Sequence, residues 1–132
     1  MKPVKLLTGF LVLTSAAIIS CNGKSSPKDL IVNKWKITDI SGKGVEGMPD
    51  SAKTKIYESA TMEFMKDGKF VTSDMGNGVK KGTYSIINDG KTLVSTDEGA
   101  ASSDSLQLVE ITKDKMVVND TKSEVKITFG HK

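Results

Sequence analysis

The chain has 132 residues with 19 basic and 16 acidic side chains, and every basic residue except the single histidine is a lysine. This length suffices for one domain and not for two. Without arginine to hold phosphates bidentately, nucleic-acid binding is not expected, and one cysteine with one histidine excludes a disulfide framework or a zinc cluster.

Residues 1–20 have the composition of a secretory signal peptide. Two lysines near the start precede an uncharged, mainly apolar run, residues 6–19, that is too short to span a bilayer as a helix. The run ends in Ile18-Ile19-Ser20-Cys21, which resembles the lipobox of bacterial lipoproteins. The resemblance implies cleavage between Ser20 and Cys21. It also implies that fatty acyl chains such as palmitate are attached to Cys21.

Residues 21–29 are expected to form a lipidated polar tether between the membrane and the folded domain. They contain glycine, two serines and proline, a composition typical of linkers. Asn22 is not the aspartate that is associated with retention in the inner membrane, so the resemblance implies the outer membrane. We expect the periplasmic face, while exposure on the cell surface stays open.

Residues 30–132 are predicted to form one all-β domain. Short alternating stretches are separated by glycine-containing turns about every 8 to 15 residues, which is typical of antiparallel sandwiches and barrels. Because closure removes exposed strand edges, we expect an eight-stranded antiparallel up-and-down barrel. The expected strands are residues 35–41, 61–65, 70–74, 79–87, 92–96, 105–112, 116–119 and 124–129.

The turn that contains Gly68 decides how the second and third strands pair. A two-residue loop would pair Phe64 with Val71, whereas a three-residue loop would pair Phe64 with Phe70. The second register gathers Met62, Phe64 and Phe70 on one face of the sheet. We therefore predict the three-residue loop, with a positive φ at Gly68.

One insertion interrupts the strand pattern at residues 42–59. Met48, Ala52 and Ile56 recur at helical spacing, and Asp50 is placed to cap a short helix. Two interpretations stay open for this segment. It forms either a lid or plug over one end of the barrel, or a surface loop with one helical turn.

Three motifs resemble the lipocalin-like domain of small bacterial lipoproteins. They are Trp35 in the first strand, the Phe64–Phe70 hairpin with the pattern Phe-x-x-Asp-Gly-x-Phe, and Gly82-Thr83-Tyr84. The similarity extends over about residues 30–130, nearly all of the expected domain, and implies the lipocalin-like barrel. The expected interior lining is Trp35 at the closed end, with Met62, Phe64, Phe70, Tyr84 and Phe129.

Two functions are consistent with such a domain. The barrel could bind a small apolar or amphipathic ligand in its mouth, or it could be solid and dock another envelope protein as an accessory or inhibitor lipoprotein. An interior cavity of about 300 Å³ or more favours the ligand, and a packed interior favours docking. We expect no enzyme activity, cofactor or metal site, because His131 lies on a terminal tail and no nucleophile accompanies it.

Overall fold

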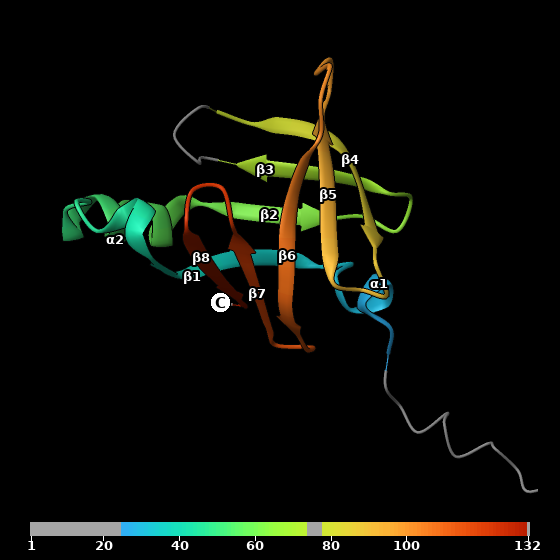
Figure 1. Ribbon diagram of the computed structural model, residues 1–132, viewed down its shortest axis with the longest axis horizontal. Coiled ribbons are helices and arrows are strands. Elements are labelled where there is room, and N and C mark those ends of the chain that lie inside the picture. Colours follow the sequence, from blue (N-terminus) through green and yellow to red (C-terminus); the bar gives the residue numbers. More distant parts are fainter. Residues whose placement is uncertain (1–24, 74–77, 132) are drawn as a thin grey trace, which may run out of the picture.

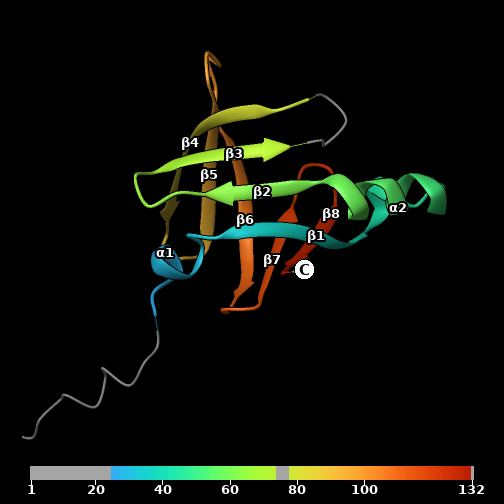
Figure 2. The same cartoon turned by 180° about the vertical axis from the view of Figure 1, so that it is seen from behind.

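The computed structural model describes residues 25–73 and 78–131 of the chain. Eight antiparallel strands form a closed barrel, in which each strand pairs with the next and β1 pairs with β8 (Figures 1 and 2). The expected up-and-down barrel is therefore confirmed. The predicted cleavage and lipidation site, Ser20 and Cys21, lies outside the described residues.

Every expected strand is present, with ends that differ by at most one residue from the expected ranges. The strands are β1 (Lys34–Ser41), β2 (Thr61–Phe64), β3 (Lys69–Ser73), β4 (Lys80–Ile87), β5 (Thr92–Asp97), β6 (Asp104–Ile111), β7 (Lys115–Asp120) and β8 (Val125–Gly130). The helices are α1 (Pro27–Leu30), the 3-10 helix η2 (Lys43–Val45) and α2 (Asp50–Ser59). Because the strands alternate in direction, α1 and the β2–β3, β4–β5 and β6–β7 turns share one end of the barrel.

The register of the β2–β3 hairpin confirms the three-residue loop. Phe64 pairs with Phe70 and Met62 with Thr72, and Gly68 has a φ of 86°. Phe64 and Phe70 are 1% and 2% exposed, with ring centroids 6.3 Å apart. Alternation along both strands thus points the apolar side chains into the barrel, as the pattern predicts.

The core runs along the axis of the barrel. Every strand contributes at least one inward apolar side chain, as expected for a small barrel that side chains fill. The most deeply buried large side chains are Trp35, Phe64, Ile31, Ile37, Leu93, Met116 and Val118.

Helix α1 closes the end of the barrel at which β1 begins. Ser26 is its N-cap residue, and the fully buried Ile31 follows the helix and accepts a 3.0 Å hydrogen bond from the Trp35 indole N–H. The helix lies against the β4–β5 turn (Figure 1), where a Cβ at Gly90 would come within 2.8 Å of Pro27. The last three residues of the expected tether, 27–29, therefore form part of the fold. We call this the closed end.

The 42–59 insertion is larger than a loop with one helical turn. It contains η2 and the ten-residue α2, which projects away from the end opposite α1 (Figure 2). The Tyr57 hydroxyl accepts a hydrogen bond from the Ile40 amide at 3.2 Å, and a Cβ at Gly44 would meet the Ser123 carbonyl at 2.2 Å. The segment thus packs beside β1 and the β7–β8 turn. The expected cap is wrong, since Pro49 is the N-cap residue and Asp50 begins the helix.

The C-terminal histidine is exposed, as expected of a tail, but its ring packs against the closed end. The His131 ring stacks on Trp35 with centroids 4.5 Å apart. Its Nε2 lies 2.7 Å from the Lys113 carbonyl oxygen, and its Nδ1 lies 3.3 Å from the Lys34 carbonyl oxygen. The ring stack and the Nε2 contact connect the first strand, β1, and the end of the last strand, β8, to the β6–β7 turn.

Candidate functional site

The end of the barrel opposite α1 is open and contains a hollow of about 230 Å³, which we call the mouth hollow. Strands β2 to β6 supply its walls, together with Gly78, which lies two residues before β4. The lining residues are Met62, Phe70, Thr72, Gly78, Lys80, Ser95, Asp97 and Asp104.

The mouth hollow is apolar on one side and charged on the other. Met62 and Phe70 supply the apolar surface. Lys80 and Asp97 form an ion pair across β4 and β5, with the ammonium nitrogen 3.9 Å from the carboxylate. Asp104 adds a second carboxylate, so the lining has one more negative charge than positive. An amphipathic molecule matches this division better than a purely apolar one.

Strand alternation explains why these polar side chains face inward. Tyr84 packs against Phe64 inside the barrel, with centroids 4.8 Å apart, so Gly82 and Lys80 on the same strand share its face. Leu93 is 1% exposed, and the same two-residue period brings Asp97 to the inside of β5.

Gly82 lets the Phe70 ring lie close to β4. A Cβ at this position would come within 2.7 Å of Phe70 Cε1 and 2.1 Å of the Thr96 carbonyl oxygen. Only glycine fits without displacing the ring or the backbone. The Gly-x-Tyr motif of the sequence therefore shapes the wall of the mouth hollow.

The six residues of the expected lining divide into two groups. Met62 and Phe70 line the mouth hollow. The other four lie deeper in the barrel or nearer the closed end, where they pack against one another or against neighbouring core residues. They are Trp35, Phe64, Tyr84 and Phe129.

Tyr84 is hydrogen-bonded to the β2–β3 turn at the closed end of the barrel. Its hydroxyl donates a 2.7 Å hydrogen bond to the Met65 carbonyl in the β2–β3 turn. Burial, followed by the nearby Asp67 carboxylate, raises the pKa of Tyr84 above its ordinary value of 10.0. The group is therefore neutral at physiological pH and serves to hold the turn.

The interior is packed. Trp35, Phe64, Phe70 and Phe129 are at most 3% exposed, and the mouth hollow is smaller than the roughly 300 Å³ of a drug-sized pocket. An apolar ligand enclosed along the barrel axis, as in a roomy lipocalin-like barrel, would have to displace these rings. By the volume criterion stated above, this packed interior favours docking over an enclosed ligand. Inside the barrel, the mouth hollow has room only for a small molecule.

A second hollow, of about 690 Å³, lies on the outside of β3, β4 and β5 and shares Phe70 and Asp97 with the mouth hollow. We call it the outer groove. Its walls mix aliphatic, hydroxyl and charged side chains with the loop after β5. The remaining lining residues are Met65, Lys69, Val71, Lys81, Gly82, Thr83, Thr96, Glu98, Gly99 and Ala100.

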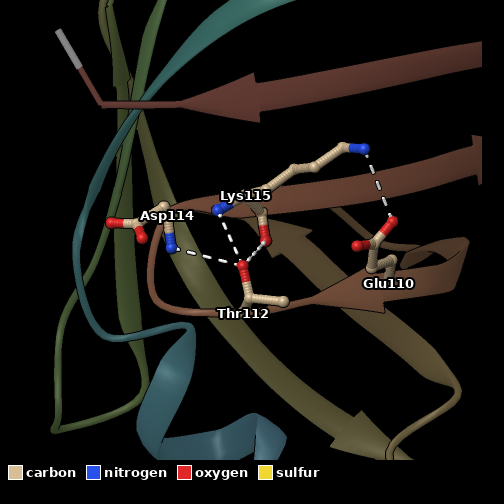
Figure 3. Close-up of polar contacts among 4 residues, drawn as sticks. All are labelled: Glu110, Thr112, Asp114 and Lys115. Atoms are coloured by element: carbon tan, nitrogen blue, oxygen red, sulfur yellow. Dashed lines mark hydrogen bonds and ion pairs between the residues drawn. The ribbon is translucent and has the colours of Figure 1, made fainter.

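A polar cluster on the β6–β7 turn has a structural role (Figure 3). The Thr112 hydroxyl accepts hydrogen bonds from the amides of Asp114 and Lys115, at 3.3 and 3.1 Å. Lys115 also pairs with Glu110 at 3.6 Å. These contacts fold a tight turn of the kind that threonine favours, and they leave no side chain arranged as a nucleophile with its base.

Residues 25–73 and 78–131 contain neither a metal-binding cluster nor a membrane-spanning helix. No group of three or more His, Cys, Asp or Glu side chains is arranged there to hold a metal ion. Within the same residues, no helix has the length and apolar character needed to cross a membrane.

Mouth residues other than Met62 and Phe70 were missed by reasoning from the sequence. Only apolar and aromatic residues were assigned to the interior, so Thr72, Lys80 and Asp97 are absent from the expected lining. The signal that could have found them is strand parity, since each lies a multiple of two residues from an inward apolar side chain.

Comparisons with known proteins agree with this architecture. The lipocalin-like domain family matches residues 31–118. A protein of the DUF4847 family from Bacteroides vulgatus has a similar structure, with a TM-score of 0.58 and 16% identity, over 78% of this chain and 94% of that one. A lipocalin-like protein from Bacteroides uniformis gives a TM-score of 0.56 at 12% identity, over 78% of this chain and 99% of that one. No curated protein matches the chain significantly.

Proposed function

The chain belongs to the family of lipocalin-like domains, and from that premise we propose that it binds a small amphipathic ligand at the mouth of its barrel. The observation that carries this proposal is the mouth hollow, where Met62 and Phe70 face Lys80, Asp97 and Asp104. The apolar part of the ligand would contact the two apolar side chains. Its polar head would reach the charged rim, where fixed charges give orientation and specificity.

The charge of the rim favours a cationic or hydrogen-bond-donating head. Lys80 is engaged by Asp97 at 3.9 Å, whereas Asp104 makes no ion pair with any described residue. A ligand ammonium group beside Asp104 would balance the extra carboxylate. A ligand carboxylate would instead meet that negative charge.

The second part of the proposal is the cellular setting. We propose that Cys21 carries the lipid anchor and that the domain lies on the periplasmic face of the outer membrane. The lipobox pattern at residues 18–21 supports the lipid anchor. Residue 22 is asparagine and not the aspartate associated with the inner membrane, which supports the outer membrane. The protein then acts by binding and not by catalysis.

Binding at the mouth can be tested with a matched pair of probes, octylamine and octanoate. The protein is a chain that begins at Cys21, since every described helix and strand lies after that residue. By isothermal titration, octylamine should bind with a Kd below about 1 mM, equivalent to about 4 kcal/mol. Octanoate should bind at least about fivefold more weakly, because of the like charge at the rim.

A single charge change provides the control. Asp104→Asn should weaken octylamine binding at least about threefold, a loss typical of one exposed charge pair. Asp89→Asn makes the same change of charge in the β4–β5 turn, at the closed end, and should leave binding unaltered. If neither probe binds below about 1 mM, ligand binding at the mouth is wrong.

Docking to another envelope protein is the second candidate. The packed interior and the outer groove of about 690 Å³ favour it, because a solid barrel offers its surface more readily than its inside. Val71→Glu in the outer groove would then abolish association with the partner, while Asp104→Asn would leave that association intact.

A further inference from the structure

Charged side chains are divided unevenly between the two ends of the barrel. The closed end comprises residues 27–34, 65–69, 88–91 and 112–115, which contain seven lysines and four aspartates, a formal net charge of +3. The connections at the open end, residues 42–60, 78–81, 97–104 and 120–124, contain six lysines and eight acidic residues, a net charge of −2. The domain is therefore an electric dipole along its barrel axis.

The lysines of the closed end are available to a partner. All seven are exposed. Only two of them form ion pairs among the described residues, Lys69 with Asp67 at 3.9 Å and Lys115 with Glu110 at 3.6 Å. The other five are Lys28, Lys34, Lys66, Lys91 and Lys113.

The surface between these lysines is hollowed and partly apolar. A hollow of about 620 Å³ lies between α1 and the β2–β3 turn, and its lining includes Lys28, Lys66, Val32 and Ile86. Ile87, beside the β4–β5 turn, is 46% exposed. Lysines around apolar side chains are suited to an interface that is itself charged at its surface and apolar beneath it.

The position of Cys21 brings this end close to a membrane. Four residues lie between it and Ser26, the N-cap residue of α1, and the five steps of chain from Cys21 to Ser26 span at most about 18 Å when extended. A lipid on Cys21 would therefore hold the closed end, and not the open end, near the bilayer.

We propose that the closed end is a membrane-facing surface that contacts anionic phospholipid head groups. This inference rests on the lipid anchor of the proposed function. Each lysine near an anionic bilayer increases the membrane partition coefficient about fivefold, and this attraction decreases as the salt concentration rises. The net negative open end is repelled by the same surface, so the two ends together fix the orientation. The mouth hollow then points away from the bilayer, where a ligand can reach it.

Orientation can be measured on a chemically anchored protein. Cys21 is the only cysteine of the chain, so a chain that begins there can be coupled through its thiol to a maleimide lipid. Vesicles of pure phosphatidylcholine are compared with vesicles that contain about one third phosphatidylglycerol. Lysine acetylation by a water-soluble reagent, read by mass spectrometry, reports which end is covered.

On the anionic vesicles, Lys66, Lys91 and Lys113 should be acetylated at least threefold more slowly than on the neutral ones. Lys53, Lys55 and Lys122, at the open end, should react at unchanged rates. Equal rates on both vesicles, or protection of the open end, would overturn the proposal. Because the coupling is chemical, this result does not depend on whether cells lipidate Cys21.

A second measurement removes the anchor. The Cys21→Ser protein should float with anionic vesicles at low salt, and less so at physiological salt. The triple variant K66Q/K91Q/K113Q should partition at least tenfold more weakly, and the matched variant K53Q/K55Q/K122Q less than twofold. Both triple variants must first show the circular dichroism of the parent. Equal losses for the two would show that net charge, and not the closed end, drives any binding.

Discussion

The indole of Trp35 and the imidazole of His131 stack face to face, with ring centroids 4.5 Å apart and planes inclined by 25°. Trp35 belongs to the first strand, and His131 follows the last one, so the contact lies where the barrel closes on itself. Hydrogen bonds from these two rings reach the Ile31 and Lys113 carbonyls. One aromatic pair thus joins α1, the β1–β8 seam and the β6–β7 turn.

Removing the histidine ring should loosen this end. His131→Ala should lower the free energy of unfolding by about 1 kcal/mol, because both an aromatic contact and a hydrogen bond are lost. His131→Phe keeps the aromatic stack, so its free energy of unfolding should decrease by less than that of His131→Ala. Urea denaturation followed by Trp35 fluorescence measures both. Equal stability of all three proteins would show that the stack is not maintained in solution.

The two paired phenylalanines should be the most sensitive positions of the β2–β3 hairpin. Phe64→Ala and Phe70→Ala should each cost about 3–5 kcal/mol, since a buried aromatic ring is replaced by a cavity. Glu63→Ala, at the exposed neighbouring position that pairs with Val71, should change stability by less than about 0.5 kcal/mol. Denaturant unfolding of the three variants provides the test. Similar small losses at all three positions would contradict the register.

The β7–β8 turn should make stability depend on pH. The Ser123 hydroxyl, with the Lys122 and Ser123 amides, donates hydrogen bonds to the Asp120 carboxylate and lowers its pKa below 3.8. A lowered pKa in the folded state contributes stability above the unfolded value, and this contribution is lost as pH falls through the folded one.

Asp120→Ala should therefore cost less than about 1 kcal/mol near pH 7, because solvent screens these exposed hydrogen bonds. The gap from wild type should narrow only below about pH 4, as the carboxylate is protonated. Denaturant unfolding at a series of pH values measures it. A gap that stayed constant down to pH 2 would mean that the charged form of Asp120 contributes nothing.

Lipid anchoring predicts a change of location. Cys21→Ala should move the protein from the membrane fraction to a soluble fraction, because it removes the acyl chains that anchor firmly. Fractionation of cells that express each form, followed by detergent extraction, gives the answer. A variant that stays membrane-bound and needs detergent as the wild type does would refute the anchor.

Most of the barrel was predictable from the sequence because its signals are local. Alternating strands and glycine turns located all eight strands, and the Phe64–Phe70 pairing followed from which register gathers apolar side chains. The helix at residues 27–30 was not anticipated, since a Ser-Pro pair within a polar segment is also typical of a linker. The buried Ile31 follows this helix and accepts the hydrogen bond of the Trp35 indole, a tertiary contact that a local pattern does not reveal.

The site was less predictable because it depends on contacts between distant segments. Met62 and Phe70 were expected to face a ligand, and they line the mouth hollow. Asp97 and Lys80 come together only through the pairing of β4 with β5. His131 was misread because its partner, Trp35, is at the other end of the domain sequence.

Binding of a small amphipathic molecule at the mouth of the packed barrel can be observed residue by residue. Its most direct test is a map of backbone amide chemical shifts as octylamine is added to the ¹⁵N-labelled protein that begins at Cys21. Saturable shifts are expected at Thr72, Lys80, Ser95 and Asp97, with small changes at the closed end around Ile31. Shifts centred on the closed end, or none at millimolar octylamine, would contradict it.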